Sequence, residues 1–460
     1  MRQILIPYPQ YKETNDLWIN KVPSHWTLTR QKNIVKMLVS NVDKHTNEGE
    51  IPVRLCNYID VYKNDRIAAS LKFMQASAKP DEIEQFRLRP DDLLITKDSE
   101  SWIDIGVPAL VEYTADDLIC GYHLAILRSK KEKISGGYLN RLHQCQNVKI
   151  QYHVNANGVT RYGLSHGSIE NIVLSLPPIE EQNAIVRFLD YTDRRIKRYV
   201  RAKQKLIKLL EEEKQAIIHQ AVTRGLNPDV PLKSSGVEWM GNIPTNWNII
   251  PSKRVLSIRS GEYLNSSKFS LEISAETPYP VIGGNGVMGF TDVYNTSPIS
   301  IVVGRVGALC GNIHMIDELS WVTDNALRIE TFKRIDPLFL SHQLQIINLN
   351  KLANKNAQPL ITGSMVKSQF LLIPPIEEQI KIVNFINNKA TKINNLIENI
   401  FQQNSLFQEY RTRLIADVVT GKLDVRAVAA QLPEDLEEEE IDLEEVEPEE
   451  DDELEEALEP

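Results

Sequence analysis

One stretch of sequence occurs twice in this chain. Residues 176–182 read Leu-Pro-Pro-Ile-Glu-Glu-Gln, and residues 373–379, which begin 197 positions later, read Ile-Pro-Pro-Ile-Glu-Glu-Gln. A second set of matches brackets the first, because four residues return at an offset of 221 positions. These are Lys12, Trp18, Pro23 and Trp26, which match Lys233, Trp239, Pro244 and Trp247. Two ordered sets of matches at fixed offsets indicate an internal duplication, and this constrains the fold more than any single motif does.

The duplicated segments frame two blocks of unlike sequence. The offsets differ by 221 − 197 = 24, so the first block (27–175) is 24 residues longer than the second (248–372). Both blocks alternate short apolar runs with polar, Gly-rich loops, which predicts mixed α/β domains. The expected strands lie at 92–97 and 123–128 in the first block, and at 280–282, 299–303 and 326–329 in the second.

Each Pro-Pro motif predicts the start of a long helix. Proline suits the first helical turn, and the two glutamates that follow in each copy place negative charge at the positive end of the helix dipole. No Gly or Pro interrupts either run, and an apolar residue recurs by alternate steps of four and three in the same register in both copies. The expected seam consists of Ile185, Leu189, Ile196, Tyr199, Leu206, Leu210 and Ile217 in the first helix, and of Ile382, Ile386, Ile393, Leu396, Ile400, Phe407 and Leu414 in the second.

An apolar seam with this spacing calls for a coiled-coil partner. If the two helices pair with each other, chain order makes them antiparallel, with a globular block at each end. The alternative is two helices packed separately in two domains, but their matched register and length favour pairing. The sequence therefore predicts an α+β fold in which two globular α/β domains are separated by a pair of long antiparallel coiled-coil helices, with a pseudo-twofold internal repeat.

The repeats also set the expected domain boundaries. These are 1–176 for the N-terminal domain, 177–225 for the first (central) spacer helix, 226–373 for the C-terminal domain, 374–425 for the second (C-terminal) spacer helix and 426–460 for an acidic disordered tail. The formal net charge of −10 conceals this division. Residues 434–460 hold 18 acidic residues and no Lys or Arg, so the rest of the chain has 62 − 18 = 44 acids against 52 bases, a charge of +8. A basic body is compatible with nucleic-acid binding, although +8 is also unremarkable for a chain of this length.

Composition and cysteine usage suggest an ordinary soluble protein. The chain is 42% hydrophobic and 25% charged, and no apolar run approaches the roughly 18 residues of a membrane helix. The start, which Pro7 interrupts early, is too short for a signal peptide. We therefore expect a cytoplasmic protein. The four cysteines show no C-x-x-C spacing, which favours buried free thiols over a zinc site or a disulfide framework.

Motifs that would carry chemistry fail on their context. Residues 284–289 match the dinucleotide pattern G-x-G-x-x-G, but a strand-like segment (290–295) follows where that motif requires a helix, so the glycines are expected in tight turns. No G-x-x-x-x-G-K-[ST] loop and no H-E-x-x-H or H-x-H spacing occurs. We expect no catalytic residue, no metal site and no cofactor bound by this chain.

The framed duplication resembles the specificity (S) subunit of a Type I restriction–modification system. The resemblance covers nearly all of residues 8–425. It rests on the paired helix starts, on the paired segments 18–26 and 238–247, and on the two variable blocks between them. The acidic tail departs from this pattern.

This resemblance implies a non-catalytic chain that directs the activity of other subunits. Each block would be a target-recognition domain that reads one half of a bipartite, asymmetric DNA site, and the helices would act as a spacer. The implied partners are double-stranded DNA, two modification (methyltransferase) subunits that carry S-adenosylmethionine, and a restriction (motor-nuclease) subunit that uses ATP. The alternative from another class is a coiled-coil protein-interaction scaffold without DNA binding, and recovery of nucleic acid with the tail-less protein would separate the two.

Polar loop residues are the candidates for DNA contact, because basic and amide side chains supply contacts to phosphates and base edges. The candidates are Lys97, Arg161, Tyr162 and Ser165 in the first block, and Asn285, Arg305, Gln358 and Thr362 in the second. Each could instead be an ordinary surface residue, and Ser165 and Thr362 could cap short helices.

Overall fold

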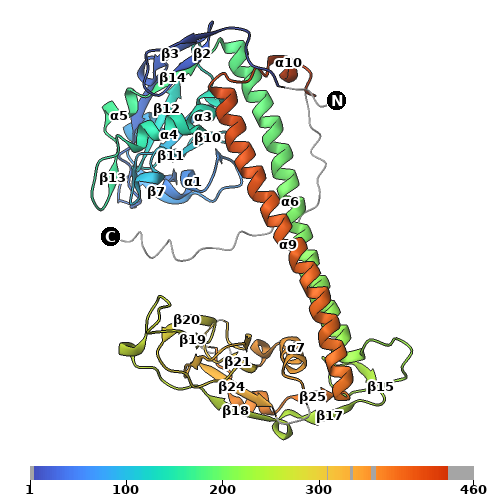
Figure 1. Ribbon diagram of the computed structural model, residues 1–460. Coiled ribbons are helices and arrows are strands. Elements are labelled where there is room, and N and C mark those ends of the chain that lie inside the picture. Colours follow the sequence, from blue (N-terminus) through green and yellow to red (C-terminus); the bar gives the residue numbers. More distant parts are fainter. Residues whose placement is uncertain (1–4, 308, 332–334, 354–358, 434–460) are drawn as a thin grey trace. The chain divides into compact units, whose positions relative to one another are not determined.

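The computed structural model describes residues 5–307, 309–331, 335–353 and 359–433. The chain divides into two compact units (Figure 1). The first unit contains residues 1–199 and 405–460, and the second contains residues 200–404. Each unit therefore combines one of the two framed blocks with one end of each long helix.

A five-stranded sheet with the order β4-β12-β8-β10-β6 forms the centre of the first unit. Its strands are β4 (Val35–Val39), β6 (Arg66–Ile67), β8 (Asp92–Thr96), β10 (Pro108–Val111) and β12 (Leu124–Ser129). All five residues of β8 are buried. Leu93 and Ile95 pack into one cluster, and Leu94, which points to the other face of the sheet, packs into another. Both faces of the sheet are therefore covered.

Smaller elements cover these faces and connect the strands. A three-stranded sheet consists of β5 (Ile51–Cys56), β7 (Met74–Ala78) and β11 (Leu118–Cys120). Three two-stranded pairs are β1 (Tyr11–Glu13) with β2 (Lys21–Pro23), β3 (Thr27–Arg30) with β14 (Val173–Leu176), and β9 (Asp98–Ser99) with β13 (Tyr162–Gly163). The helices are α1 (Tyr58–Tyr62), α2 (Pro80–Phe86), α3 (Gly136–Gln144), α4 (Gln146–His153) and α5 (His166–Glu170), with 3-10 turns η1 (Gln31–Asn33) and η2 (Trp102–Asp104).

The second unit repeats this plan with fewer elements. Its central sheet has the order β18-β24-β21-β22 and consists of β18 (Leu256–Ser260), β21 (Ser300–Gly304), β22 (Ile313–Ile316) and β24 (Ala326–Thr331). The smaller sheet consists of β19 (Tyr279–Gly283), β20 (Gly286–Thr291) and β23 (Trp321–Val322), and the strand pairs are β15 (Leu232–Ser234) with β16 (Asn242–Pro244) and β17 (Asn248–Pro251) with β25 (Phe370–Ile373). The short helices are α7 (Pro337–Ile347), α8 (Gly363–Lys367), η3 (Ser252–Arg254), η4 (Ser266–Lys268) and η5 (Leu349–Leu352).

Topology confirms the duplication that the sequence indicated. The strand pairs β3–β14 and β17–β25 are equivalent, as are β4-β12-β8 and β18-β24-β21. The elements α1, α2 and β6 have no counterpart among the described residues of the second unit, which accounts for the longer first block. Gly284 lies in the turn of the β19–β20 hairpin, as predicted, whereas Gly286 and Gly289 lie within β20.

Both predicted long helices are present. They are α6 (Ile179–Arg224), with 46 residues, and α9 (Ile376–Val419), with 44. Each begins directly after its Pro-Pro pair and has two glutamates in the first turn. Each ends before a glycine with positive φ, at Gly225 (74°) and Gly421 (73°), a conformation that a side chain would make costly.

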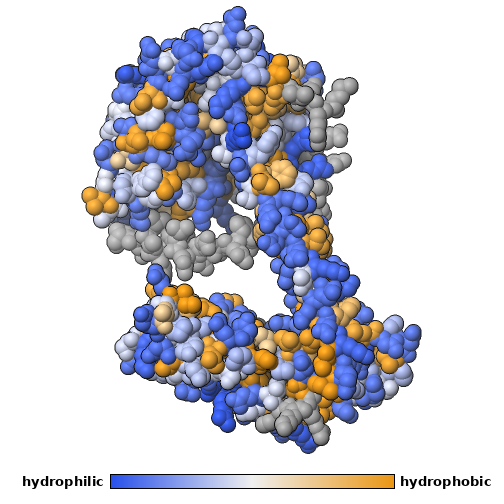
Figure 2. All heavy atoms as spheres, in the orientation of Figure 1, coloured by the Kyte–Doolittle hydropathy of each residue, from blue (hydrophilic) through white to orange (hydrophobic). Residues whose placement is uncertain are grey.

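The helices pack together in antiparallel fashion within each unit. In the first unit, the start of α6 lies against the end of α9, where Phe188 and Leu189 share a core with Leu414 and Val418. In the second unit, the end of α6 lies against the start of α9, where residues 218, 221 and 222 share a core with residues 382, 383 and 386. The face of the helix pair seen in Figure 2 is mostly hydrophilic.

The predicted seam is correct at one position in every seven, and most of the positions between are shifted by one, although Ile185 and Ile382 are buried as predicted. Leu189, Ile196, Ile386, Ile393, Ile400 and Leu414 are buried as expected. In contrast, Leu206 and Leu396 are exposed by 39% and 52%, whereas the next residues, Ile207 and Ile397, are less exposed. Tyr199 is 37% exposed, although its ring packs 4.5 Å from that of Phe407. The prediction assigned steps of four and three in the wrong order, because seven-residue spacing alone does not fix which step comes first.

Folded structure continues beyond residue 425. Helix α10 (Arg426–Ala429) lies in the segment that the sequence assigned to the tail, and Ala429 is buried in the core of the first unit. Arg187 Nη2, on α6, donates to Leu432 O. The segment assigned to the tail is therefore folded at its start, and the acidic residues 434–460 lie outside the described residues.

Candidate nucleic-acid interface

In each unit, a tryptophan from the set of matches offset by 221 residues donates a hydrogen bond to a glutamate from the set offset by 197. Trp26 Nε1 donates to Glu181 Oε1 at 3.0 Å, and Trp247 Nε1 donates to Glu378 Oε2 at 3.1 Å. Both tryptophans are fully buried. The two sets of sequence matches thus meet in the same contact in each unit. This contact attaches the segment before each block to the first turn of a long helix.

A second joint fixes each block to its helix. Gln182 Oε1, on α6, accepts the backbone N–H of Ser135 at 3.0 Å, and Gln379 Oε1, on α9, accepts that of Asp336 at 2.8 Å. Ser135 and Asp336 are the N-cap residues of α3 and α7. The glutamine of the repeated motif therefore positions the helix that covers the central sheet.

An equivalent backbone hydrogen bond in each unit places one candidate residue at the end of a strand of the central sheet. Leu164 N donates to Lys97 O at 3.0 Å in the first unit, and Ile361 N donates to Arg305 O at 2.8 Å in the second. Lys97 and Arg305 directly follow β8 and β21. They are therefore equivalent, although neither sequence offset aligns them. We call the residues around Lys97 the first rim, which consists of Lys97, Asp98, His123 and Arg161. We call those around Arg305 the second rim, which consists of Ser260, Asn285, Arg305 and Asp324.

Ser165 and Thr362 lie beside the rims as helix caps. Ser165 Oγ accepts the backbone N–H of Ser168 at 3.1 Å and begins α5. Thr362 Oγ1 accepts that of Met365 at 3.3 Å and begins α8. The capping alternative that the sequence left open is thus confirmed for both, and DNA contact by them stays a prediction.

Four charged or polar side chains converge at the first rim. Arg161 Nη2 lies 2.8 Å from His123 Nε2, and His123 Nδ1 lies 3.5 Å from Asp98 Oδ2. Lys97 Nζ donates to the same Asp98 oxygen. Although burial opposes the ionisation of Asp98, the nearby His123 ring and the Lys97 ammonium hold the pKa of its carboxyl below the usual value. The carboxylate is therefore charged at neutral pH and anchors the group.

The sequence prediction named Lys97 and Arg161 here but missed His123 and Asp98. A signal for His123 was present, because it directly precedes β12, the antiparallel neighbour of β8. The residue after one strand and the residue before its antiparallel neighbour lie at the same end of the strand pair. Tyr162, also predicted, pairs with Ser99 and packs partly against the core, so less of it is available at the surface.

The second rim holds a different set of side chains. Arg305 Nη1 lies 3.3 Å from Ser260 Oγ and 3.4 Å from the carbonyl oxygen of Asp324, and Asn285 is exposed in the neighbouring hairpin turn. Gln358, the remaining candidate, lies outside the described residues. Gly284, next to Asn285, packs against the backbone of Arg305, so the hairpin of the smaller sheet brings Asn285 close to Arg305 at the end of β21.

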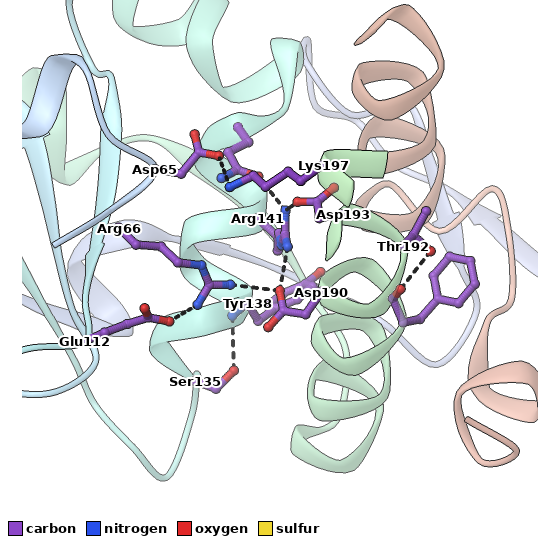
Figure 3. A network of polar contacts seen from close by, with 12 residues as sticks. Asp65, Arg66, Glu112, Ser135, Tyr138, Arg141, Asp190, Thr192, Asp193 and Lys197 are labelled. Atoms are coloured by element: carbon purple, nitrogen blue, oxygen red, sulfur yellow. Dashed lines mark hydrogen bonds and ion pairs between the residues drawn. The ribbon is translucent and has the colours of Figure 1, made fainter. Parts of the chain in front are cut away.

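An ionic network fastens the first block to the helices beneath it (Figure 3). Arg141, on α3 and 3% exposed, donates to both Asp190 and Asp193 on α6. Arg66 Nη2 also donates to Asp190, at 2.9 Å, and Arg66 pairs with Glu112. Helix α3 and strand β6 of the block are thereby tied to one turn of α6.

Other features bear on the expected chemistry. All four cysteines are free and buried, as predicted. Within the described residues, no group of three or more His, Cys, Asp or Glu side chains is arranged to hold a metal ion. The described helices include none that is long and apolar enough to cross a membrane.

Comparison with known proteins adds an independent finding. A family model described as the Type I restriction modification DNA specificity domain matches residues 23–208 and 244–403. The chain is 23% identical over 451 residues to the type I restriction enzyme MjaVIII specificity subunit of Methanocaldococcus jannaschii, covering 90% of this chain and 97% of that one. It is 28% identical over 144 residues to the type I restriction enzyme EcoprrI specificity subunit of Escherichia coli, covering 31% of this chain and 36% of that one.

A solved structure shares the fold. It comes from work on complex assembly and conformational transition of the type I R-M system, and it matches with a TM-score of 0.68 at 16% identity. The match covers 87% of this chain and 99% of the solved one.

Proposed function

The chain belongs to the family of type I restriction modification DNA specificity domains, and from this premise we propose that each of its two blocks reads one half of a bipartite, asymmetric DNA target. The chain is a DNA target-recognition subunit, and family membership favours this function over the protein-binding scaffold that the long helices alone would also permit. Two readers with unlike side chains imply two unlike half-sites, in contrast to the palindromes that identical subunits read.

The observation that carries this proposal is the equivalence of the two rims. Lys97 and Arg305 occupy the same backbone position, and yet the side chains around them differ in charge and shape. A duplicated scaffold that holds two unlike polar edges is suited to reading two unlike sequences. We propose Lys97, Arg161 and Tyr162 as DNA contacts of the first domain and Asn285 and Arg305 as those of the second, with Ser165, Gln358 and Thr362 as further candidates.

The reaction would be performed by partner subunits. We propose that two modification subunits, which bind S-adenosylmethionine, dock on this chain for methylation, and that a restriction subunit, which uses ATP, joins for cleavage. The chain itself would be non-catalytic and would bind no cofactor. A chain that directs the modification of cellular DNA would act in the cytoplasm.

Selection from a randomised duplex library tests DNA recognition directly. The full-length chain should enrich duplexes with two short fixed sequences separated by a gap of constant length and free sequence. Enrichment of no sequence, or of a palindrome, would contradict the proposal.

A methylation assay tests the division of labour. The purified chain with S-adenosylmethionine should transfer no methyl group to DNA, whereas addition of its modification subunits should produce methylation within the selected site. Methyl transfer by the chain alone would contradict the non-catalytic assignment.

A further inference from the structure

We infer that Arg161 reads a guanine in the half-site of the first domain, and that His123 is a positioning residue that presents the Arg161 guanidinium to it. This inference rests on the proposed function, because it assigns one base contact within the first half-site. It commits to a base edge as the ligand, and a phosphate contact is an alternative outcome of the test.

Arg161 differs from its neighbours in exposure. The side chains of His123, Lys97 and Asp98 are 16%, 17% and 22% exposed, whereas Arg161 is exposed to solvent. The ring of Tyr122 packs 3.6 Å from that of His123, and the carbonyl oxygen of His123 accepts the backbone N–H of Lys97 at 2.8 Å. The imidazole is therefore held from several sides, while Arg161, which donates to it, is exposed.

The direction of each hydrogen bond follows from the chemistry of the groups. A guanidinium only donates, so His123 Nε2 must accept from Arg161. A neutral imidazole that accepts at Nε2 carries its proton on Nδ1, and Nδ1 faces the Asp98 carboxylate at 3.5 Å. The nearby Asp98 carboxylate thus favours the tautomer of His123 that can accept from Arg161, and this acceptor orients the guanidinium.

Arg161 keeps most of its donors for a ligand. A guanidinium has five N–H donors, and the structure gives Arg161 one hydrogen-bond partner, His123, among the described residues. Lys97 is already paired with Asp98, so Arg161 carries the uncompensated positive charge of the first rim. A planar fork of donors matches the O6 and N7 acceptors of guanine in the major groove, the commonest specific contact of arginine with DNA.

Pre-organisation favours a base contact over a phosphate contact. A phosphate offers acceptor oxygens in several directions and carries no direct sequence information, so the exact orientation of a guanidinium matters less for a phosphate contact than for a base contact. A base edge accepts only in its own plane, so an arginine already held by His123 loses less conformational freedom when it binds. Arg305, at the second rim, is held by a serine hydroxyl and a backbone carbonyl, so the second domain presents its arginine differently.

The test repeats the selection from a randomised duplex library with the full-length wild-type chain and the Arg161→Lys, His123→Ala and His123→Gln variants. Arg161→Lys keeps the charge and removes the fork. It should lower the preference for one G·C pair in one half-site by about 10- to 100-fold, with the other half-site unchanged. His123→Ala should relax the same base pair, and His123→Gln, whose amide oxygen can accept from Arg161, should restore part of the preference.

Salt dependence separates a base contact from a phosphate contact. If Arg161 contacts a phosphate, Arg161→Ala should weaken binding to all duplexes alike and reduce the slope of log affinity against log salt by about one, and Arg161→Lys should change little. That result would overturn the inference, as would relaxation of different base pairs by the Arg161 and His123 variants. Thermal unfolding of each variant shows whether the substitution disrupts folding in general. Unchanged recognition of the second half-site is the internal control for a folded chain.

Failure of the inference is distinguishable from failure of the proposed function. If the wild-type chain selects a split site and the variants keep every base preference, DNA recognition stands and the role of Arg161 does not. If the wild-type chain selects no sequence, the proposed function itself fails.

Discussion

Arg411, on α9, donates to both carboxylate oxygens of Asp193, on α6, with Nε 3.0 Å from Oδ1 and Nη2 3.0 Å from Oδ2. The same carboxylate accepts from Arg141 on α3, and Arg411 Nη2 also lies 3.1 Å from Asp65. One buried carboxylate therefore joins both long helices to the first block. In the second unit the 197-residue repeat places Ala390 at the position of Asp193 and Lys214 at that of Arg411.

Asp193→Ala should destabilise the first unit. The change leaves Arg141, which is 3% exposed, without one of its two acidic partners on α6. Removal of one partner from a buried ion pair typically costs about 3–5 kcal/mol. Hydrogen exchange of the full-length chain should show faster exchange in peptides from the start of α6 and from α3. The matched control is Lys214→Ala in the second unit, where the exposed contact to Asn394 should contribute under about 0.5 kcal/mol. Equal effects of the two variants would argue against a buried clamp.

Acid should weaken the same clamp. Although burial opposes its ionisation, the charges of Arg141 and Arg411 hold the pKa of Asp193 below its usual value. A folded pKa below the unfolded one, which is about 3.9, means that the stabilisation is complete above that value and is lost as pH falls through the folded pKa. Unfolding of the first unit between about pH 4 and pH 2 should therefore be steeper in the wild type than in Asp193→Asn. Identical pH profiles would show that the carboxylate is not the titrating group.

Glu181→Ala should cost more stability than Glu378→Ala. Glu378 accepts from Trp247, whereas Glu181 accepts from Trp26 and Tyr8 and lies 2.8 Å from His25 Nε2. A buried donor left without an acceptor costs about 1–3 kcal/mol, so the first unit should lose at least one such increment more than the second. Urea unfolding of both variants measures the difference, and a larger effect of Glu378→Ala would contradict this ranking.

Insertion of one heptad into both long helices should change the gap in the DNA target. Seven residues lengthen a helix by about 10 Å and preserve the seven-residue repeat of the seam. This length corresponds to about three base pairs at 3.4 Å each. Library selection should return the same half-sites with a different separation. An unchanged gap would show that the helices do not set the spacing, and insertion into one helix alone is the control that should disrupt pairing.

Deletion of the acidic residues 434–460 should strengthen non-specific DNA binding at low salt. The segment carries 18 negative charges and follows Leu432, which Arg187 on α6 anchors. We hypothesise that this tethered polyanion competes with DNA for the basic surface, because tethering gives it a high effective concentration. The gain on deletion should shrink as salt rises. Equal binding by both forms at low salt would leave solubility as the role of the segment.

The duplication carried most of the predictable structure. Trp26 and Trp247 are 221 positions apart, and Glu181 and Glu378 are 197 positions apart. These repeats determined that the chain contains two copies of one scaffold. Chain order then determined that α6 and α9 run antiparallel. The central strands could also be located, since buried strands such as β8 contain short apolar runs. Patterns of this kind are local, because they follow from the geometry of a single helix or strand.

Only the tertiary structure decided which side chains meet. Arg161 and His123 lie 38 positions apart, and their contact depends on the antiparallel pairing of β8 with β12 and on the course of the loop before β13. Lys97 and Arg305 become equivalent through backbone hydrogen bonds that neither offset encodes. Even the seam needed the partner helix, because two choices of register share every seventh residue and burial against the partner selects one. Contacts between distant segments depend on how the elements pack, and packing is a property of the whole fold rather than of any one stretch of sequence.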